Sequence, residues 1–214
     1  YLCGDMLINK GFPQDILNDI ADEDIFLIKD ALYIESFSEN LSFNSPNKIN
    51  LKATTIFIEV PDTKLYAIEF FNWENGKSYW NDGFTISGSE DFELINGRLL
   101  YENEGIKYTA SIPRLNDGSI TNIDIFGHVD QSDKISGAIS YPFGSTNLKG
   151  YVLYKINVNS NTTTFGCNIV NYLHYNTPFR IPYIIPEHQN LMFNNNLNQH
   201  CTNFSIEKDT EITN

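Results

Sequence analysis

Short runs of β-branched and aromatic residues recur along most of this chain, and they constrain its fold more than any other feature. Turn-forming residues stand between consecutive runs, and about ten such strands predict a mainly β chain folded as an antiparallel β-sandwich. Residues 149–158 alternate in polarity, which favours a sheet with one buried face. No helical pattern alternates with the runs, which disfavours a parallel sheet. The runs cover residues 54–60, 64–71, 83–87, 92–95, 98–102, 106–112, 120–128, 134–141, 150–158 and 164–175.

Specific turns are predicted between several of these runs. The runs at 54–60 and 64–71 flank a Pro-Asp-Thr segment at 61–63, a combination that predicts a β-hairpin. Asn-Gly pairs at 75–76 and 96–97 also predict turns.

A helical period appears only near the N-terminus. Pro13 stands where a first helical turn tolerates proline, and Ile16, Leu17 and Ile20 then form an apolar stripe on a helix of about two turns. Acidic residues at 22–24 open a second helix, where they face the positive end of its dipole. The sequence therefore predicts a short pair of helices.

The segment after the helices is polar and predicts a boundary. Residues 36–50 include Pro46 and are expected to form a linker or long loop. We therefore expect a helical pair and linker over 1–50, packed on a β-sandwich domain over 51–214. From residue 176 onward the prolines and polar residues predict an irregular C-terminal tail, with an edge strand added at 201–206.

The charge of the chain excludes several classes of partner. Its 14 Lys and Arg residues face 27 Asp and Glu residues, for a formal net charge of -13. Nucleic acid and anionic lipid are bound mainly through Lys and Arg, so neither is expected as a partner. No apolar stretch approaches the roughly 20 residues of a membrane-spanning helix, so membrane insertion is not expected.

The cysteines and histidines carry no motif. Cys167 and Cys201 either form one bridge or are buried free thiols, and Cys3 stands apart near the N-terminus. The four histidines lack the spacing of metal ligands, so no metal site is predicted. Cys167 and His174 would lie about 23 Å apart on one straight strand, which excludes a local catalytic pair.

Other catalytic signatures are missing as well. The chain has no Gly-x-Ser-x-Gly element, no P-loop and no dinucleotide fingerprint, so neither a catalytic residue nor a cofactor is predicted. Acidic residues such as Asp82, Asp117 and Asp130 fall in expected loops, but they do not match a calcium-binding loop and are interpreted as turn residues.

Aromatic and amide residues gather in one segment, which is the candidate ligand-binding site. Its members are Trp73, Tyr79, Trp80, Asn81 and Asp82. Aromatic rings stack on sugar rings while amides and carboxylates bind the sugar hydroxyls, so the cluster indicates a carbohydrate or protein ligand. In the alternative interpretation, both tryptophans pack inward as core residues.

Three short motifs resemble a loose group of uncharacterised secreted proteins of AT-rich Gram-positive bacteria. They are Gly-Phe-Pro at 11–13 with Ile-Leu-Asn at 16–18, Asp-Glu-Asp-Ile at 22–25, and a strand ending in Asn72 and Trp73. The similarity covers the helical pair and the first part of the β region. It implies an exported bacterial protein, at the cell surface or outside the cell. The resemblance implies no particular activity or catalytic residue.

These observations lead to two hypotheses of function. In the first, the chain is an exported, non-enzymatic module that binds a protein or a carbohydrate. In the second, it is a hydrolase whose polar residues converge only in three dimensions, in a cleft that holds two carboxylates or a histidine with an acid or thiol.

Overall fold

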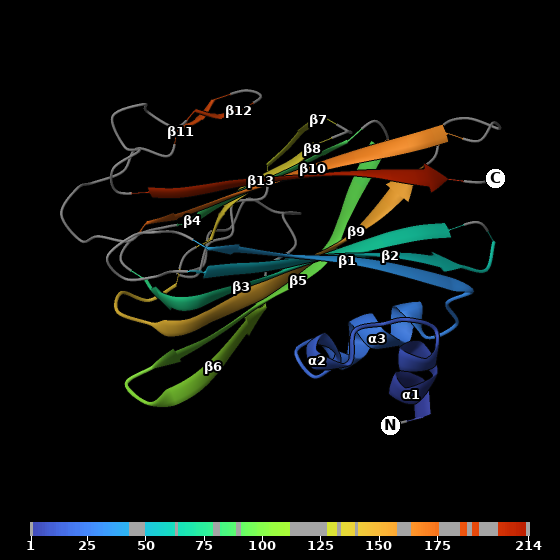
Figure 1. Ribbon diagram of the computed structural model, residues 1–214, viewed down its shortest axis with the longest axis horizontal. Coiled ribbons are helices and arrows are strands. Elements are labelled where there is room, and N and C mark those ends of the chain that lie inside the picture. Colours follow the sequence, from blue (N-terminus) through green and yellow to red (C-terminus); the bar gives the residue numbers. More distant parts are fainter. Residues whose placement is uncertain are drawn as a thin grey trace.

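The computed structural model describes most of the chain in separate stretches. These are residues 2–42, 50–62, 64–78, 82–88, 91–111, 128–131, 134–139, 141–157, 164–175, 185–187, 190–192 and 201–212. Within them, strands predominate and a few short helices precede them (Figure 1). The prediction of a mainly β chain is confirmed.

Three helices, not two, form the N-terminal part: α1 (Leu2–Asn9), α2 (Gln14–Leu17) and α3 (Asp22–Ile28). The first predicted helix, of about two turns, was too long, because α2 is a single turn after Pro13. The acidic first turn of α3 lies where the sequence predicts it. We did not predict α1, whose apolar stripe is too short to give a clear helical period.

A six-stranded antiparallel sheet forms the centre of the molecule. Its order is β1-β2-β3-β9-β5-β6. The predicted hairpin is confirmed, since β2 pairs with β3 from Asn50 to Val60 and Val60 lies opposite Lys64. The strands are β1 (Tyr33–Ser42), β2 (Asn50–Val60), β3 (Lys64–Lys77), β5 (Asp91–Asn103), β6 (Ile106–Ser111) and β9 (Thr146–Asn157).

A second antiparallel sheet has the order β13-β10-β4-β8-β7 and lies on the side of the first sheet away from the helices (Figure 1). The predicted C-terminal edge strand is confirmed and runs further than expected, to Ile212. These strands are β4 (Asp82–Gly88), β7 (His128–Gln131), β8 (Lys134–Ile139), β10 (Thr164–Tyr175) and β13 (Cys201–Ile212), and a separate pair is formed by β11 (Ile185–Glu187) and β12 (Asn190–Met192).

Both faces of the six-stranded sheet are buried, each in its own core. The helix side contains Leu7, Ile16 and Ile28 of the N-terminal segment, packed on apolar residues of β2, β3 and β9. The opposite side is rich in aromatic rings, including Phe71, Trp73 and Tyr154. Because β2, β3 and β9 are covered on both faces, they read as nearly continuous apolar runs.

The predicted linker is wrong for residues 36–42, which belong to β1 and pair with β2 from Ser36 opposite Ile56 to Ser42 opposite Asn50. β1 is the edge strand of the sheet, and its residues 36, 38 and 40 are exposed. Polar residues on an exposed strand face resemble a loop in sequence. The rest of the predicted linker, residues 43–49, lies outside the described residues.

Both Asn-Gly turn predictions at 75–76 and 96–97 are wrong. The pairs lie inside β3 and β5, next to shifts of register between Trp73 and Lys77 and between Leu94 and Asn96. These shifts insert extra residues into one strand, as β-bulges do, and Asn tolerates the unusual backbone angles that such irregularities share with turns. Asn75, for example, has a φ of 61°.

A bridge between Cys167 and Cys201 is incompatible with the register of β10 and β13. Cys201 lies opposite Tyr175, whereas Cys167 lies opposite Asp209. Positions 167 and 175 of one strand are about 26 Å apart, far beyond the roughly 7 Å limit between the Cα atoms of a disulfide. The described Cys3 is a free thiol.

A carboxyl group lies inside the aromatic-rich core. Glu69 is only 2% exposed and lies on the same face of β3 as the core residues Ala67 and Phe71. It accepts hydrogen bonds from Thr55 Oγ1 at 2.8 Å and from Tyr154 Oη at 3.1 Å. Burial outweighs these two bonds and raises the pKa of Glu69 from its ordinary 4.5 to about 8.

We expect this carboxyl to make stability depend on pH. The folded state keeps the proton up to about pH 8, whereas the unfolded chain loses it near 4.5. The contribution of Glu69 to the free energy of unfolding is therefore complete below pH 4.5. It is lost as the pH rises through 8, by roughly 3–5 kcal/mol. Urea unfolding of wild type and E69Q across this range measures the effect. The free energy of unfolding of E69Q relative to that of wild type should increase with pH. A difference between the two proteins that stays constant would contradict the assignment.

Candidate functional site

Of the predicted aromatic site, the structure describes Trp73 and Asp82, which lie in different sheets. Trp73 is 1% exposed and belongs to the aromatic-rich core on the sheet face away from the helices, which is the alternative given for it above. Its neighbours Asn72 and Glu74 lie on the opposite face of β3, because side chains alternate along a strand. Asp82 begins β4 in the second sheet, and residues 79–81 lie outside the described part of the chain.

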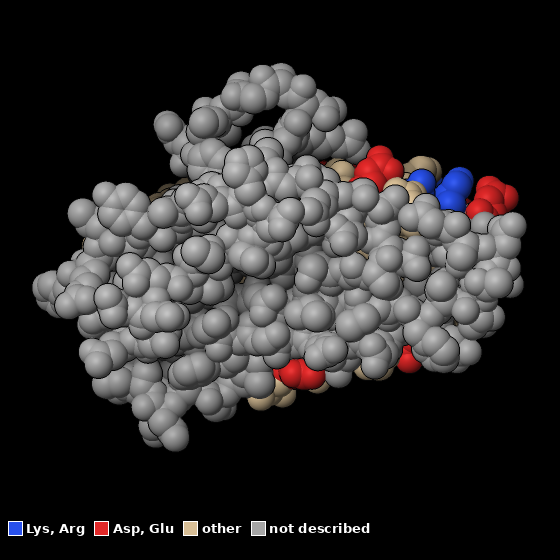
Figure 2. All heavy atoms as spheres, turned by 90° about the horizontal axis from the view of Figure 1, so that it is seen from above, with Lys and Arg blue, Asp and Glu red and all other residues tan. Residues whose placement is uncertain are grey.

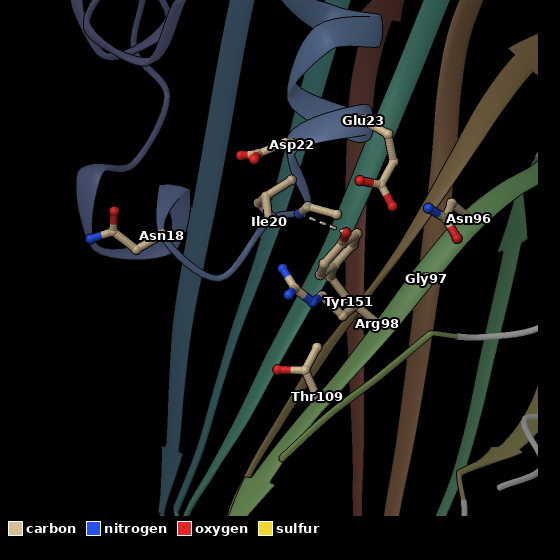
Figure 3. Close-up of a pocket in the computed structure, with 10 residues that line it drawn as sticks. Asn18, Ile20, Asp22, Glu23, Asn96, Gly97, Arg98, Thr109 and Tyr151 are labelled. Atoms are coloured by element: carbon tan, nitrogen blue, oxygen red, sulfur yellow. Dashed lines mark hydrogen bonds between the residues drawn. The ribbon is translucent and has the colours of Figure 1, made fainter. Parts of the chain in front are cut away.

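A buried polar network joins the helices to the sheet. Asp24 of α3 is 3% exposed, and its carboxylate accepts a 2.5 Å hydrogen bond from Tyr151 Oη of β9. The side-chain amide of Asn96 on β5 donates to both carboxylate oxygens, at 3.0 and 3.1 Å. The backbone N–H of Ala21 donates to Tyr151 Oη at 3.1 Å (Figure 3). Three segments that are distant in sequence are thereby fixed relative to one another.

The role of Tyr151 in this network is structural. Burial, followed by the hydrogen bond to Asp24, raises the pKa of the phenol well above its ordinary value of 10. The hydroxyl therefore stays protonated and keeps donating to Asp24. It is not a candidate nucleophile, since a nucleophile needs the opposite shift.

A polar hollow of about 380 Å³ lies beside the network, between the helical segment and strands β5 and β6 (Figure 3). The connection from α2 to α3 and the first turn of α3 form one wall, and β5, β6 and β9 form the other. Its polar wall residues include Asn18, Glu23, Asn96, Arg98, Thr109 and Tyr151.

A second hollow of about 480 Å³ adjoins the first, and Thr109 lines both. It lies on the helix side of the sheet, beyond the area that the helices cover. Asn147 Nδ2 donates to Glu102 Oε2 at 2.9 Å across it. Together the two hollows form one groove, called the cap groove here, and the residues of the second hollow include Asn72, Glu74, Glu102, Lys107, Asn147 and Lys149.

Polar residues replace apolar ones along the same strand face where the groove begins. On β3, Tyr66, Ile68 and Phe70 are buried on the helix side, and Asn72 and Glu74 follow in the same alternation. The change ends the apolar surface on which the helices pack. It leaves the remaining strand surface solvated.

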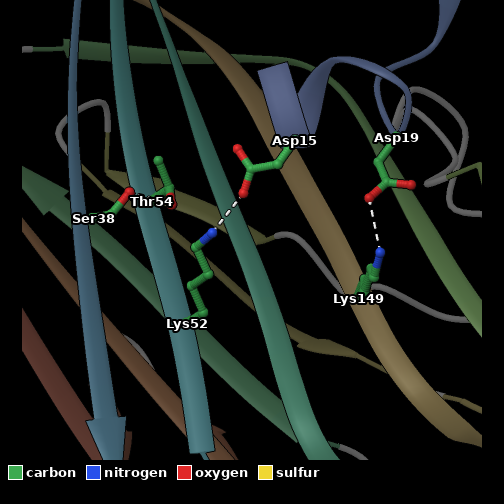
Figure 4. Close-up of polar contacts among 6 residues, drawn as sticks. All are labelled: Asp15, Asp19, Ser38, Lys52, Thr54 and Lys149. Atoms are coloured by element: carbon green, nitrogen blue, oxygen red, sulfur yellow. Dashed lines mark hydrogen bonds and ion pairs between the residues drawn. The ribbon is translucent and has the colours of Figure 1, made fainter. Parts of the chain in front are cut away.

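Two ion pairs hold the α2 region at the margin of the groove (Figure 4). Lys149 Nζ lies 3.1 Å from Asp19 Oδ2, and Lys52 Nζ lies 2.5 Å from Asp15 Oδ2. The hydrogen bond from Lys52 lowers the pKa of Asp15. Since these side chains are partly exposed, each pair contributes only about 0–1 kcal/mol and serves mainly to orient the segment.

Figure 2 shows the face opposite the helices, where the described charged side chains lie at the margins and carry both signs. Both hollows are on the helix side. The cap groove is therefore the best-defined candidate site in the described part of the chain.

The titratable side chains that line the groove are carboxylates, lysines, tyrosines and one arginine. Neither hollow is lined by histidine, cysteine or serine. Within the described ranges, no group of three metal-ligating residues is close enough to hold an ion. The hydrolase hypothesis requires converging residues of these kinds or a carboxylate pair, and no contact within the groove supports it.

The network and the groove were not predicted from the sequence, although one signal was available. Asp24 stands four residues before Ile28 and seven before Ala31, which are both fully buried. It therefore lies on the buried face of its helix, where a carboxylate requires donors. Asn96 and Arg98 gave no comparable signal, because their places depend on the bulge in β5.

We expect Y151F to destabilise the fold by about 1–3 kcal/mol, because it leaves Asp24 and the N–H of Ala21 each without one partner. Urea denaturation at pH 7 measures the loss. The matched control is Y33F, at a tyrosine that is 57% exposed, and its effect should stay within about 0.5 kcal/mol. Equal stabilities for the two variants would show that the network does not hold the helices.

Comparison with known proteins adds no family to this description. No protein-family model matches the chain, and no curated protein matches it either. No helix among the described residues is long and apolar enough to cross a membrane. The functional argument therefore rests on the geometry of the cap groove.

Proposed function

We propose that this chain is a non-enzymatic binding module with a β-sandwich fold, that its ligand is a carbohydrate, and that it acts outside the cell or at the cell surface. The binding site in this proposal is the cap groove. The extracellular location follows the resemblance of its N-terminal motifs to exported bacterial proteins.

The aromatic core supports the sandwich. Phe71, Trp73 and Tyr154 are buried on the sheet face that looks away from the helices, so a second layer has to cover them. The five-stranded sheet lies on that side (Figure 1). A sandwich of about ten strands would give each sheet one face in a shared core.

The side chains of the larger hollow support a carbohydrate ligand, and this observation carries the proposal. Sugar hydroxyls both donate and accept, and the hollow offers amides, carboxylates and ammonium groups. Its volume of about 480 Å³ lies in the usual range for small-ligand sites, roughly 300–1,000 Å³. Because most of its residues are on paired strands, these groups are held in place before a ligand binds.

Aromatic residues also border this hollow. Tyr101 and Tyr108 both line it and stack on each other, with ring centroids 5.3 Å apart and an angle of 17° between the planes. Tyr101 belongs to the core on the opposite face of the sheet and is the cross-strand partner of Tyr108, so the two rings lie behind the wall of the hollow and support it. Trp73 lines the same hollow but is buried, so it supports the wall beneath the ligand.

The composition of the groove favours a sugar over a protein. Protein interfaces are usually anchored by large apolar side chains at a desolvated centre. The centre of the cap groove contains amides and charges instead, including Asn72, Glu102, Lys107 and Thr109.

We expect the wild-type chain to bind oligosaccharides on a glycan array and N72A to weaken that binding by about 3- to 10-fold, the effect of losing one or two hydrogen bonds. The matched control is N40A, at an exposed asparagine of β1 on the same sheet but outside both hollows. N40A should bind as wild type does. Failure of wild type to bind any glycan, or equal losses in the two variants, would refute the proposed site.

A further inference from the structure

Arg98 presents an unusual charge in the smaller hollow of the cap groove. It lies on β5, partly buried, and lines the hollow beside Tyr151. Its guanidinium makes no hydrogen bond or ion pair with the described residues, although Asp22 and Glu23 line the same hollow. In Figure 3 the carboxylate of Glu23 extends toward Asn96, whereas the guanidinium of Arg98 lies on the other side of Tyr151.

An unpaired arginine is unexpected in this protein. With 27 acidic residues against 14 basic ones, carboxylates are abundant, and Lys52 and Lys149 of the same sheet face are each paired with one. A partly desolvated guanidinium has five donors in a planar fork that matches a carboxylate. Its donors are therefore available to a ligand in the hollow.

A second donor lies close to Arg98. Thr109 of β6 lines the same hollow, and Figure 3 shows its hydroxyl on the same side of the hollow as the guanidinium. Thr109 also lines the larger hollow, so a ligand that occupies both passes this position. The carboxylates of Asp22 and Glu23 repel an anion elsewhere in the hollow, which confines an acidic group to the end at Arg98.

We propose that Arg98 and Thr109 form a carboxylate-binding subsite of the cap groove, and that the glycan it takes carries acidic sugars such as uronic acids. This inference rests on the proposed function and specifies its ligand class. The neutral part of the glycan occupies the larger hollow, and the acidic sugar occupies the smaller one. Arg98 is the one cation among the described residues that line the smaller hollow, so in a protein with a surplus of negative charge it decides whether an acidic group is accepted there.

The test uses an array of uronic-acid oligosaccharides together with the same oligosaccharides after reduction of their carboxyl groups to primary alcohols. Wild type should bind the acidic forms about 10-fold or more tightly than the reduced ones. R98Q preserves much of the side-chain volume but not the charge, so it should abolish this preference and bind the acidic and the reduced forms with affinities within about 2-fold of each other. R98K should keep part of the preference, because it retains a charge without the planar fork.

K64Q is the matched control, because it removes one positive charge at an exposed lysine outside both hollows and should leave the preference intact. Thermal unfolding of each variant establishes that it is folded. If wild type binds the reduced glycans equally well, or if R98Q keeps the preference, the carboxylate subsite is refuted while the glycan-binding function stands. If wild type binds neither form, the proposed function fails and this inference fails with it.

Discussion

The arrangement of this molecule depends on one buried carboxylate, Asp24. A carboxylate removed from water is costly unless donors replace its hydration, and here Tyr151 and Asn96 supply them from two different strands. Each donor has a fixed place in the sheet, so Asp24 has only one position in which it is satisfied. The network therefore sets where α3 begins and where the wall of the smaller hollow stands.

The helix side of the six-stranded sheet is used partly for packing and partly for binding. The apolar part of β2, β3 and β9 is covered by the helices, and the polar part beyond Phe70 remains solvated. The cap groove forms where the two parts meet. Its side chains are fixed by strands on one wall and by the Asp24 network on the other, which gives a binding surface that does not have to be organised when a ligand arrives.

The sequence predicts the strands that are covered on both faces better than it predicts the edges. The hairpin of β2 and β3 matches because β-branched and aromatic residues dominate there. β1 was missed because its exposed positions are polar, and the bulges were taken for turns because Asn and Gly suit both. The predicted site required the Trp73 side chain to be exposed. Alternation along the strand does not decide this, because it does not tell which faces of the sheet are covered.

The central claim is that the cap groove, and not the segment around residues 79–82, receives the ligand. The most direct measurement is a titration of the isotope-labelled protein with an oligosaccharide that it binds, followed by backbone amide NMR shifts. We expect the largest shifts at residues 18–23, 72–75, 96–109 and 147–151, which line the groove. Shifts confined to residues 79–82 or to the strands of the second sheet would contradict this account.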